Sequence, residues 1–252
     1  MNFNIQPINF NIANVRFKSN SNISQPKGSD LERNPKMDSF EMSIGYVNDA
    51  HGQTNNMMRI LSGIKGDLKL SAGDNDIGDE KNDAIHQATT KFLNIADIKA
   101  SALGNHEIDM SQKDCIDAIN RFNGLMLSIN FEQIPLEEQD LEDIQKYGRA
   151  DLKNHLTKSA VVEVKGEKIG LIGASPIDMM SRLTHPNYYT DCSVDDLDDT
   201  IELIQNEIDK FKEQNINKVI LVSHLGHKAD KFVAENIDGI DVIVGGHTHE
   251  LI

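Results

Sequence analysis

The sequence predicts a layered α/β fold, because short apolar runs alternate with helical patterns along most of its 252 residues. These runs are short enough to be strands buried in a sheet, and clusters of Gly, Asn, Asp and His follow them. Strands are expected at residues 42–47, 68–72, 100–103, 125–129, 168–172, 219–223 and 242–244. Helices are expected between them, at residues 55–64, 81–96, 111–122, 194–213 and 228–236.

The helix expected over residues 194–213 has the clearest pattern. Its apolar side chains recur every three or four positions and so share one helical face, at Val194, Leu197, Ile201, Ile204, Ile208 and Phe211. Ser193 stands in position to cap its first turn, with Asp196 three residues later as in a capping box.

One interruption of the alternation predicts an antiparallel pair of strands. Residues 161–164 and 169–172 flank Lys165-Gly166, a dipeptide suited to a tight turn. Part of the sheet structure is therefore expected to be antiparallel.

The first 40 residues differ from the rest of the chain. They contain three of the six prolines, many Asn and Ser, and no long apolar period. Their formal charge is positive, whereas the remainder is strongly acidic. We expect residues 1–40 to form a flexible polar leader and residues 41–252 to form one domain.

Composition excludes several classes of function. The formal charge of -15 disfavours binding to nucleic acid or to an anionic membrane surface, because both require a basic face. No apolar run approaches the ~20 residues that span a bilayer. No signal peptide is visible, so we expect a cytoplasmic location.

The informative residues lie in the turns that follow five of the predicted strands. Loops at the carboxyl ends of strands in an α/β sheet meet at one edge, where ligands bind. Each of the five turns places Asp, Asn or His there, in the blocks NDAHG (48–52), GDNDIG (73–78), GNHEID (104–109), SHLG (223–226) and GGHTHE (245–250).

These residue types suit a pair of divalent cations. Imidazole, carboxylate and amide oxygen form a ligand set without thiolate, which favours Mn, Fe, Zn or Co. Two cations need about seven or eight ligand positions with one carboxylate shared between them. The candidates are Asp49, His51, Asp74, Asn105, His224, His247 and His249.

The ordered set of blocks resembles the calcineurin-like metallophosphoesterases, and most closely their 5'-nucleotidase branch. The resemblance covers roughly residues 42–252 and includes two weaker blocks, LSIN (127–130) and IGLIGAS (169–175). It implies an α/β/β/α sandwich with mixed sheets.

The resemblance also implies a role for each residue of the site. One metal would be held by Asp49, His51, Asp74 and His249, and the second by Asp74, Asn105, His224 and His247, with Asp74 bridging the two. His106 would protonate the leaving group and Asp109 would orient it. A hydroxide bridging the metals would be the nucleophile.

We therefore expect a phosphomonoesterase acting on a nucleotide or another small phosphorylated metabolite. Two alternatives stay open: a phosphodiesterase or pyrophosphatase acting on a cyclic nucleotide or nucleotide sugar, and a non-catalytic metal- or nucleotide-binding module. The 5'-nucleotidase branch carries a further C-terminal domain that binds the nucleoside. The chain stops soon after His249, so we expect it to be truncated and to lack that domain.

Overall fold

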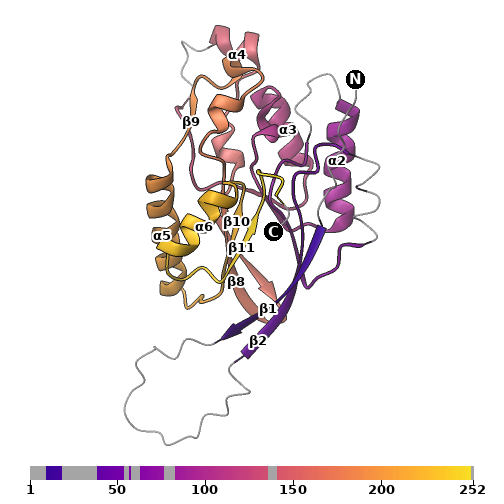
Figure 1. The fold of residues 1–252 in the computed structure, drawn as a ribbon. Coiled ribbons are helices and arrows are strands. Elements are labelled where there is room, and N and C mark those ends of the chain that lie inside the picture. The colour runs from indigo at the N-terminus through magenta and orange to yellow at the C-terminus, as the bar shows by residue number, and fades with distance from the viewer. Residues whose placement is uncertain are drawn as a thin grey trace, which may run out of the picture.

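The computed structural model describes residues 10–18, 39–53, 57, 63–76, 83–135 and 141–250. Two main sheets face each other across a buried core, and helices cover the outer face of each sheet (Figure 1). The predicted α/β class and its four-layer α/β/β/α order are both confirmed.

The first sheet has the strand order β1-β2-β3-β4-β5 and holds three of the candidate loops at its carboxyl edge. Its inner strands are parallel, and only β1 runs antiparallel to its neighbour β2. The strands are β1 (Phe10–Lys18), β2 (Ser39–Val47), β3 (Leu68–Ser71), β4 (Ala100–Ala102) and β5 (Leu125–Leu127).

The second sheet has the strand order β11-β10-β8-β7 and holds the other two loops. Strands β8, β10 and β11 are parallel, and β7 pairs antiparallel with β8 through the predicted hairpin turn. The strands are β7 (Ser159–Val164), β8 (Glu167–Ala174), β10 (Val219–Ser223) and β11 (Val242–Gly245). A separate two-stranded sheet joins β6 (Phe131–Gln133) and β9 (Cys192–Val194).

The helices form the two outer layers. Leu93 and Phe122, from the helices α2 and α3 and their ends, pack near Val47 of the first sheet. Ile204 and Val233, from α5 and α6, pack against Leu221 of the second sheet. The helices are α2 (Asp83–Ala96), α3 (Gln112–Arg121), α4 (Leu141–Tyr147), α5 (Leu197–Glu213) and α6 (His227–Asn236).

Strand register aligns the ends that carry the candidate residues. Val47 of β2 pairs with Ser71 of β3, and Ser223 of β10 pairs with Gly245 of β11. The two sheets pack through side chains such as Leu70 and Val222, which are fully buried between them. The loops that leave these strands therefore meet at one edge of the sandwich.

The expected leader is wrong for residues 10–18, which form β1. Val15 and Phe17 turn inward and contact the central core, while Asn14 and Arg16 are exposed. This alternation with period two is the signature of a strand with one buried face. The rest of the expected leader, residues 1–9 and 19–38, lies outside the described residues.

One predicted helix begins at a later residue than expected, and another lies mostly outside the described residues. Helix α5 starts at Leu197, and Asp196, whose side chain accepts from the Asp199 backbone N–H at 3.0 Å, caps it in place of Ser193. Ser193 instead pairs with Glu132 in the small sheet. The helix expected at residues 55–64 lies mostly outside the described residues.

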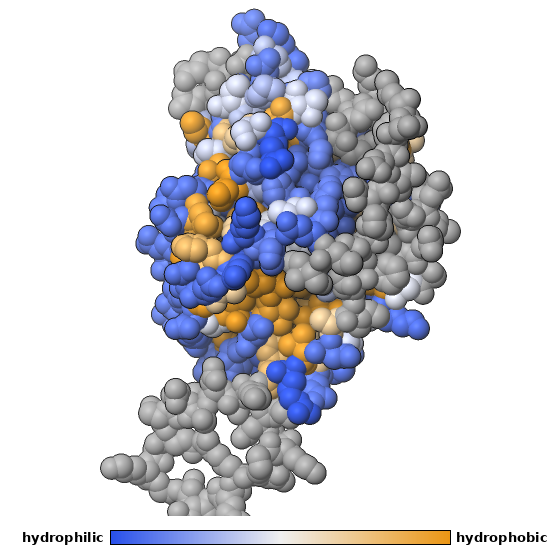
Figure 2. All heavy atoms as spheres, in the orientation of Figure 1, coloured by the Kyte–Doolittle hydropathy of each residue, from blue (hydrophilic) through white to orange (hydrophobic). Residues whose placement is uncertain are grey.

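Apolar surface remains where the two main sheets open to solvent. Figure 2 shows it in the lower half of the view, over the strands that Figure 1 labels there. Partly buried side chains packed against the central core include Val15, Phe40, Val162 and Val242. No helix in the described part of the chain has both the length and the apolar character needed to cross a membrane.

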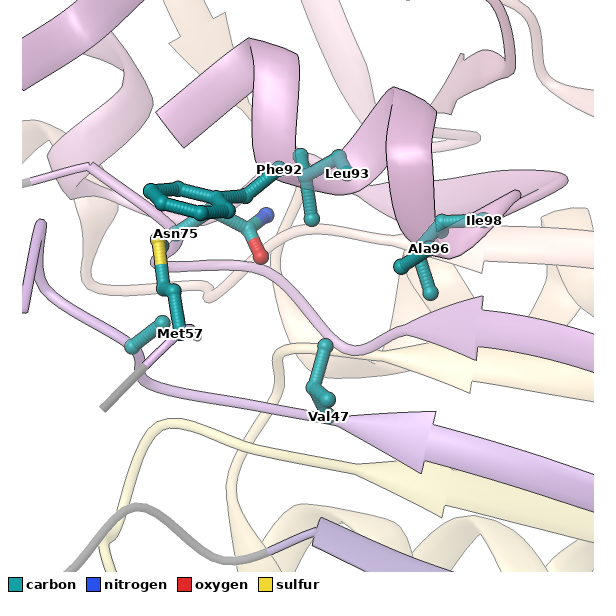
Figure 3. Close-up of a pocket in the computed structure, with 8 residues that line it drawn as sticks. Val47, Met57, Asn75, Phe92, Leu93, Ala96 and Ile98 are labelled. Carbon is teal, nitrogen blue, oxygen red and sulfur yellow. The ribbon is translucent and has the colours of Figure 1, made fainter. Parts of the chain in front are cut away.

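The loop that follows β3 borders a small apolar pocket. It lies between the end of β2 and α2, and is lined by Val47, Met57 and Leu93 together with Asn75 (Figure 3). Asn75 is held in place because its amide donates to Ser101 Oγ at 3.0 Å and its Oδ1 accepts from Ser71 Oγ at 2.7 Å. The residue before it, Asp74, is therefore attached to a rigid support.

Candidate metal centre

The five predicted loops meet at one edge of the sandwich, and three of them hold candidate ligands in an unusual backbone conformation. Among the described residues, eight that are not glycine have a positive φ, and five of them are candidate ligands: Asp49, His51, Asp74, His247 and His249. Such conformations cost free energy for residues with a Cβ, and they gather at functional sites where the surrounding structure enforces them. The backbone here is arranged to aim these side chains.

One cluster joins the first loop to the last. The Nε2 atoms of His51 and His249 lie 2.9 Å apart, and Asp49 Oδ1 is 3.4 Å from His249 Nε2. One potential ligand atom from each of the three residues lies within 4.8 Å of the others. Two imidazole nitrogens and a carboxylate converging in this way form the donor set of a divalent cation site.

A second cluster surrounds Asp74. His224 Nε2 lies 3.0 Å from Asp74 Oδ2, and His247 completes a group whose ligand atoms are within 4.8 Å of one another. The other ring nitrogen of His224 contacts the Ala72 carbonyl oxygen at 2.5 Å, which leaves Nε2 facing the carboxylates. A histidine oriented by a backbone carbonyl is typical of metal ligands.

Asn105 also fits a cation at this cluster. Its side-chain Oδ1 is buried and has no hydrogen-bond partner among the described residues. A buried carbonyl oxygen without a partner costs about 1–3 kcal/mol, and a cation would satisfy it. All seven predicted ligands thus lie at the same edge, and the donors that they present fit divalent cations.

Glycine is required where the third loop passes Asp74. A Cβ at Gly104 would lie 2.3 Å from Asp74 Oδ1, closer than any side chain allows. The His106 backbone N–H donates to the same Asp74 oxygen at 2.9 Å. The loop can approach Asp74 this closely only because Gly104 carries no side chain.

Glu107 ties the second and third loops together. Its Oε2 accepts from the backbone N–H groups of Asp74 and Gly104 at 3.0 and 2.9 Å, and its Oε1 accepts from that of Asn75 at 2.6 Å. Burial, together with the nearby charge of Asp74, raises the pKa of Glu107 to about 7. In the sequence Glu107 is marked only by its place in the block GNHEID, two positions after Asn105.

Electrostatics within the second cluster favour an ion pair. Burial disfavours the charged forms of both partners, but their mutual attraction outweighs it. The pKa of His224 is consequently raised to about 9, and the pKa of Asp74 lies well below its usual range. The carboxylate therefore carries its negative charge, as a cation ligand must.

His106 and Asp109 form a hydrogen-bonded pair beside the clusters. Asp109 is buried, and its Oδ2 lies 2.5 Å from His106 Nδ1, while the His106 side chain remains 34% exposed. The His106 ring also lies edge-on to His51, with centroids 4.8 Å apart. Burial lowers the pKa of His106, but Asp109 and Asp74 outweigh that effect and raise it overall.

Two further residues contact the site without any signal in the sequence. Asp178 Oδ1 lies 3.3 Å from His247 Nε2, and Thr184 donates to Asp109 Oδ1. Both belong to the irregular segment after β8, where no repeated pattern or motif marks them. Only the folded arrangement brings them to the ligands.

Comparison with known proteins identifies the family of the chain. The family model described as calcineurin-like phosphoesterase matches residues 42–251. A 5'-nucleotidase of Mus musculus is 32% identical over 163 residues, which cover 64% of this chain and 25% of that protein. An apyrase of Anopheles gambiae is 32% identical over 242 residues, which cover 84% of this chain and 40% of that protein.

The chain is also similar to a solved structure. The 5'-nucleotidase precursor of Thermus thermophilus superposes with a TM-score of 0.66 at 25% identity, over 82% of this chain and 42% of that chain. The chain thus spans between a quarter and about two fifths of the length of these relatives.

Proposed function

The chain belongs to the calcineurin-like phosphoesterase family, and from this premise we propose that it hydrolyses phosphomonoesters at a centre of two divalent cations. The substrate would be a nucleotide or another small phosphorylated metabolite, in keeping with relatives named 5'-nucleotidase. We assign this activity to the two-sheet sandwich, which includes β1 and β2 in addition to the rest of the domain expected over residues 41–252.

One observation supports the proposal: five loops from two sheets bring seven side chains that could serve as nitrogen and oxygen ligands to one edge. The 2.9 Å approach of the His51 and His249 ring nitrogens and the unpaired buried oxygen of Asn105 both fit bound cations. Asp74 contacts the second cluster through His224 and lies in a further group with His51 and His106. Asp74 is therefore the carboxylate best able to serve both cations.

Each cation would be held by four side chains. The first set is Asp49, His51, Asp74 and His249, and the second is Asp74, Asn105, His224 and His247. When bound, two such cations polarise the phosphoryl oxygens and lower the pKa of a water molecule. Mn, Zn, Fe and Co all suit this ligand set.

His106 would hold the proton that the leaving oxygen needs. Its raised pKa favours the protonated ring, and the contact between Nδ1 and Asp109 fixes which nitrogen faces outward. Nε2 can then donate to the oxygen of the departing alcohol. General acid catalysis of this kind contributes about 10²- to 10⁴-fold to a rate.

A second candidate is hydrolysis of a phosphoanhydride. The relative named apyrase, which matches 84% of this chain, favours this alternative. The same cations and the same proton donor would serve, because both reactions displace an oxygen leaving group from phosphorus.

The test is a substrate panel on metal-free protein reloaded with Mn, Co or Zn. A nucleoside 5'-monophosphate, a nucleoside 5'-diphosphate and a cyclic nucleotide are compared by chromatography of the products. Preference for the monophosphate supports the proposal, whereas preference for the diphosphate or the cyclic diester replaces it with the corresponding alternative.

A matched pair of variants separates an enzyme from a binding module. Asp49→Asn keeps an oxygen at the site but removes its charge, and Asp97→Asn makes the same change at an exposed carboxylate on another loop. Loss of turnover in the first variant alone supports the proposal. Tight metal binding without turnover in the wild-type chain would overturn it.

A further inference from the structure

We propose that the segment from residue 176 to residue 189 positions both halves of the catalytic site, through Asp178 on the metal side and Thr184 on the proton-donating side. This inference rests on the proposed function, because it assigns roles relative to His247 and His106. The two residues are six positions apart and contact two different parts of the site.

Asp178 contacts a candidate ligand directly. Its Oδ1 lies 3.3 Å from His247 Nε2, so the carboxylate faces this nitrogen of the ring. With Nε2 held in this way, Nδ1 is the nitrogen left for a cation. A carboxylate behind a ligating histidine fixes the ring and raises its basicity as a ligand.

Thr184 contacts the partner of the general acid. Its hydroxyl and its backbone N–H both donate to Asp109 Oδ1, at 2.9 and 3.2 Å. The second oxygen of the same carboxylate, Oδ2, contacts His106 Nδ1. Two donors on one oxygen set the plane of the carboxylate and direct the other oxygen at the imidazole.

The segment is anchored well enough to act as a support. Met179 is fully buried, and so is the ring of Tyr189, whose hydroxyl donates to the Met110 carbonyl oxygen at 2.8 Å. The Gln112 side chain donates to the Tyr188 carbonyl oxygen at 2.8 Å. Thr184 thus lies between buried anchor points and Asp178 lies next to one, as positioning residues require.

The first experiment compares two leaving groups. A p-nitrophenyl phosphate releases a stable anion that needs little protonation, whereas an alkyl phosphate needs a proton from His106. Thr184→Val should lower the rate of hydrolysis of the alkyl ester about tenfold, the order expected for one hydrogen bond to a charged group. The rate on the aryl ester should fall much less. Thr184→Ser, which keeps the hydroxyl, should restore the rate.

A matched control and a reference variant make the result decisive. Ser193→Ala removes an exposed hydroxyl from β9, outside the segment, and it should leave both rates unchanged. His106→Ala is measured alongside as the reference for loss of the acid. If His106→Ala shows the selective loss and Thr184→Val loses both rates equally, the positioning role is wrong while the proposed function stands. If His106→Ala itself shows no selectivity, the proposed function fails in its general-acid step.

The second experiment measures metal affinity without turnover. Calorimetric titration of metal-free protein with Mn²⁺ should show about 10- to 100-fold weaker binding at one site in Asp178→Ala. Arg182→Ala is the matched control, because it breaks the Asp178–Arg182 ion pair of 2.6 Å but leaves the contact with His247. Equal weakening in both variants, or none in either, would overturn the role of Asp178.

Discussion

The backbone N–H of His247 donates to both carboxylate oxygens of Asp49, at 3.0 and 3.1 Å. Asp49 leaves the first main sheet after β2, and His247 leaves the second after β11, so this bond joins the two sheets at the functional edge. The contact uses a backbone donor and does not depend on a cation. The protein fold therefore brings the first and last loops together, and bound cations would reinforce a connection that already exists.

Removal of metal should consequently destabilise the whole sandwich. A ligand that binds only the folded state at about 100 times its Kd stabilises that state by about 2.7 kcal/mol. We expect a chelator to lower the Tm of the wild-type protein by several degrees. In Asp74→Ala, which lacks the carboxylate shared between the two ligand sets, the chelator should have no effect, as measured by thermal unfolding.

Elemental analysis of the same variants provides the check. Asp74→Ala should be purified without metal, whereas Asp209→Ala, which changes an exposed carboxylate on α5, should keep the wild-type content. A full metal content in Asp74→Ala would show that Asp74 is not a ligand.

Replacement of His106 should separate catalysis from metal binding. The ring contacts Asp109, and neither of the two proposed ligand sets includes it, although it lies in a group with His51 and Asp74. His106→Ala should therefore retain its metal and its Tm but lose about 10²- to 10⁴-fold in kcat on a nucleoside monophosphate. Loss of metal together with activity would instead make His106 a ligand.

The sequence predicted that the candidate ligands lie close together because the relevant signal is local. Asp49 and His51, and likewise His247 and His249, stand two positions apart directly after apolar runs, and strand ends of this type meet at one edge. The blocks also appear in an order that identifies the family. Each candidate ligand could therefore be named before its neighbours in space were known, and its role as a ligand stays a prediction.

The supporting residues could not be predicted in the same way. Asp178 and Thr184 act on His247 and Asp109 from 69 and 75 positions away, in a segment with no period. Strand β1 was missed for a different reason: Asn14 and Arg16 on its exposed face dilute an apolar pattern that only Val15 and Phe17 carry clearly. Both failures arise where tertiary contacts, not local pattern, determine the structure.

Glu107 should prove essential to the architecture of the site. Each of its carboxylate oxygens accepts from two donors. Glu107→Gln replaces one of these oxygens with an NH₂ group, which cannot accept a hydrogen bond and would face two N–H donors. Glu107→Gln should lose about 1–3 kcal/mol of unfolding free energy for each group left unpaired. Urea unfolding of the metal-free protein measures this cost.

The matched control for Glu107 is Glu163→Gln, because Glu163 is exposed on β7. The free energy of unfolding of that variant should lie within about 0.5 kcal/mol of the wild-type value. If both variants were equally stable, the second and third loops would not depend on the buried carboxylate.

Asp230 should make the protein less stable as the pH rises from about 4.5 to 6.5. This carboxyl group on α6 accepts from Ser223 Oγ, but burial raises its pKa from 3.8 to about 6. A group whose pKa is higher in the folded state stabilises the fold when it is protonated, and this contribution is lost as the pH passes through the folded-state pKa.

Asp230→Asn keeps an oxygen for Ser223 and cannot ionise, so its free energy of unfolding should exceed that of the wild type by about 1–3 kcal/mol at pH 7. Urea unfolding of both proteins across this range measures the difference, with Asp209→Asn as an exposed control. A constant difference between Asp230→Asn and the wild type would mean that Asp230 is already charged in the folded protein at pH 4.5.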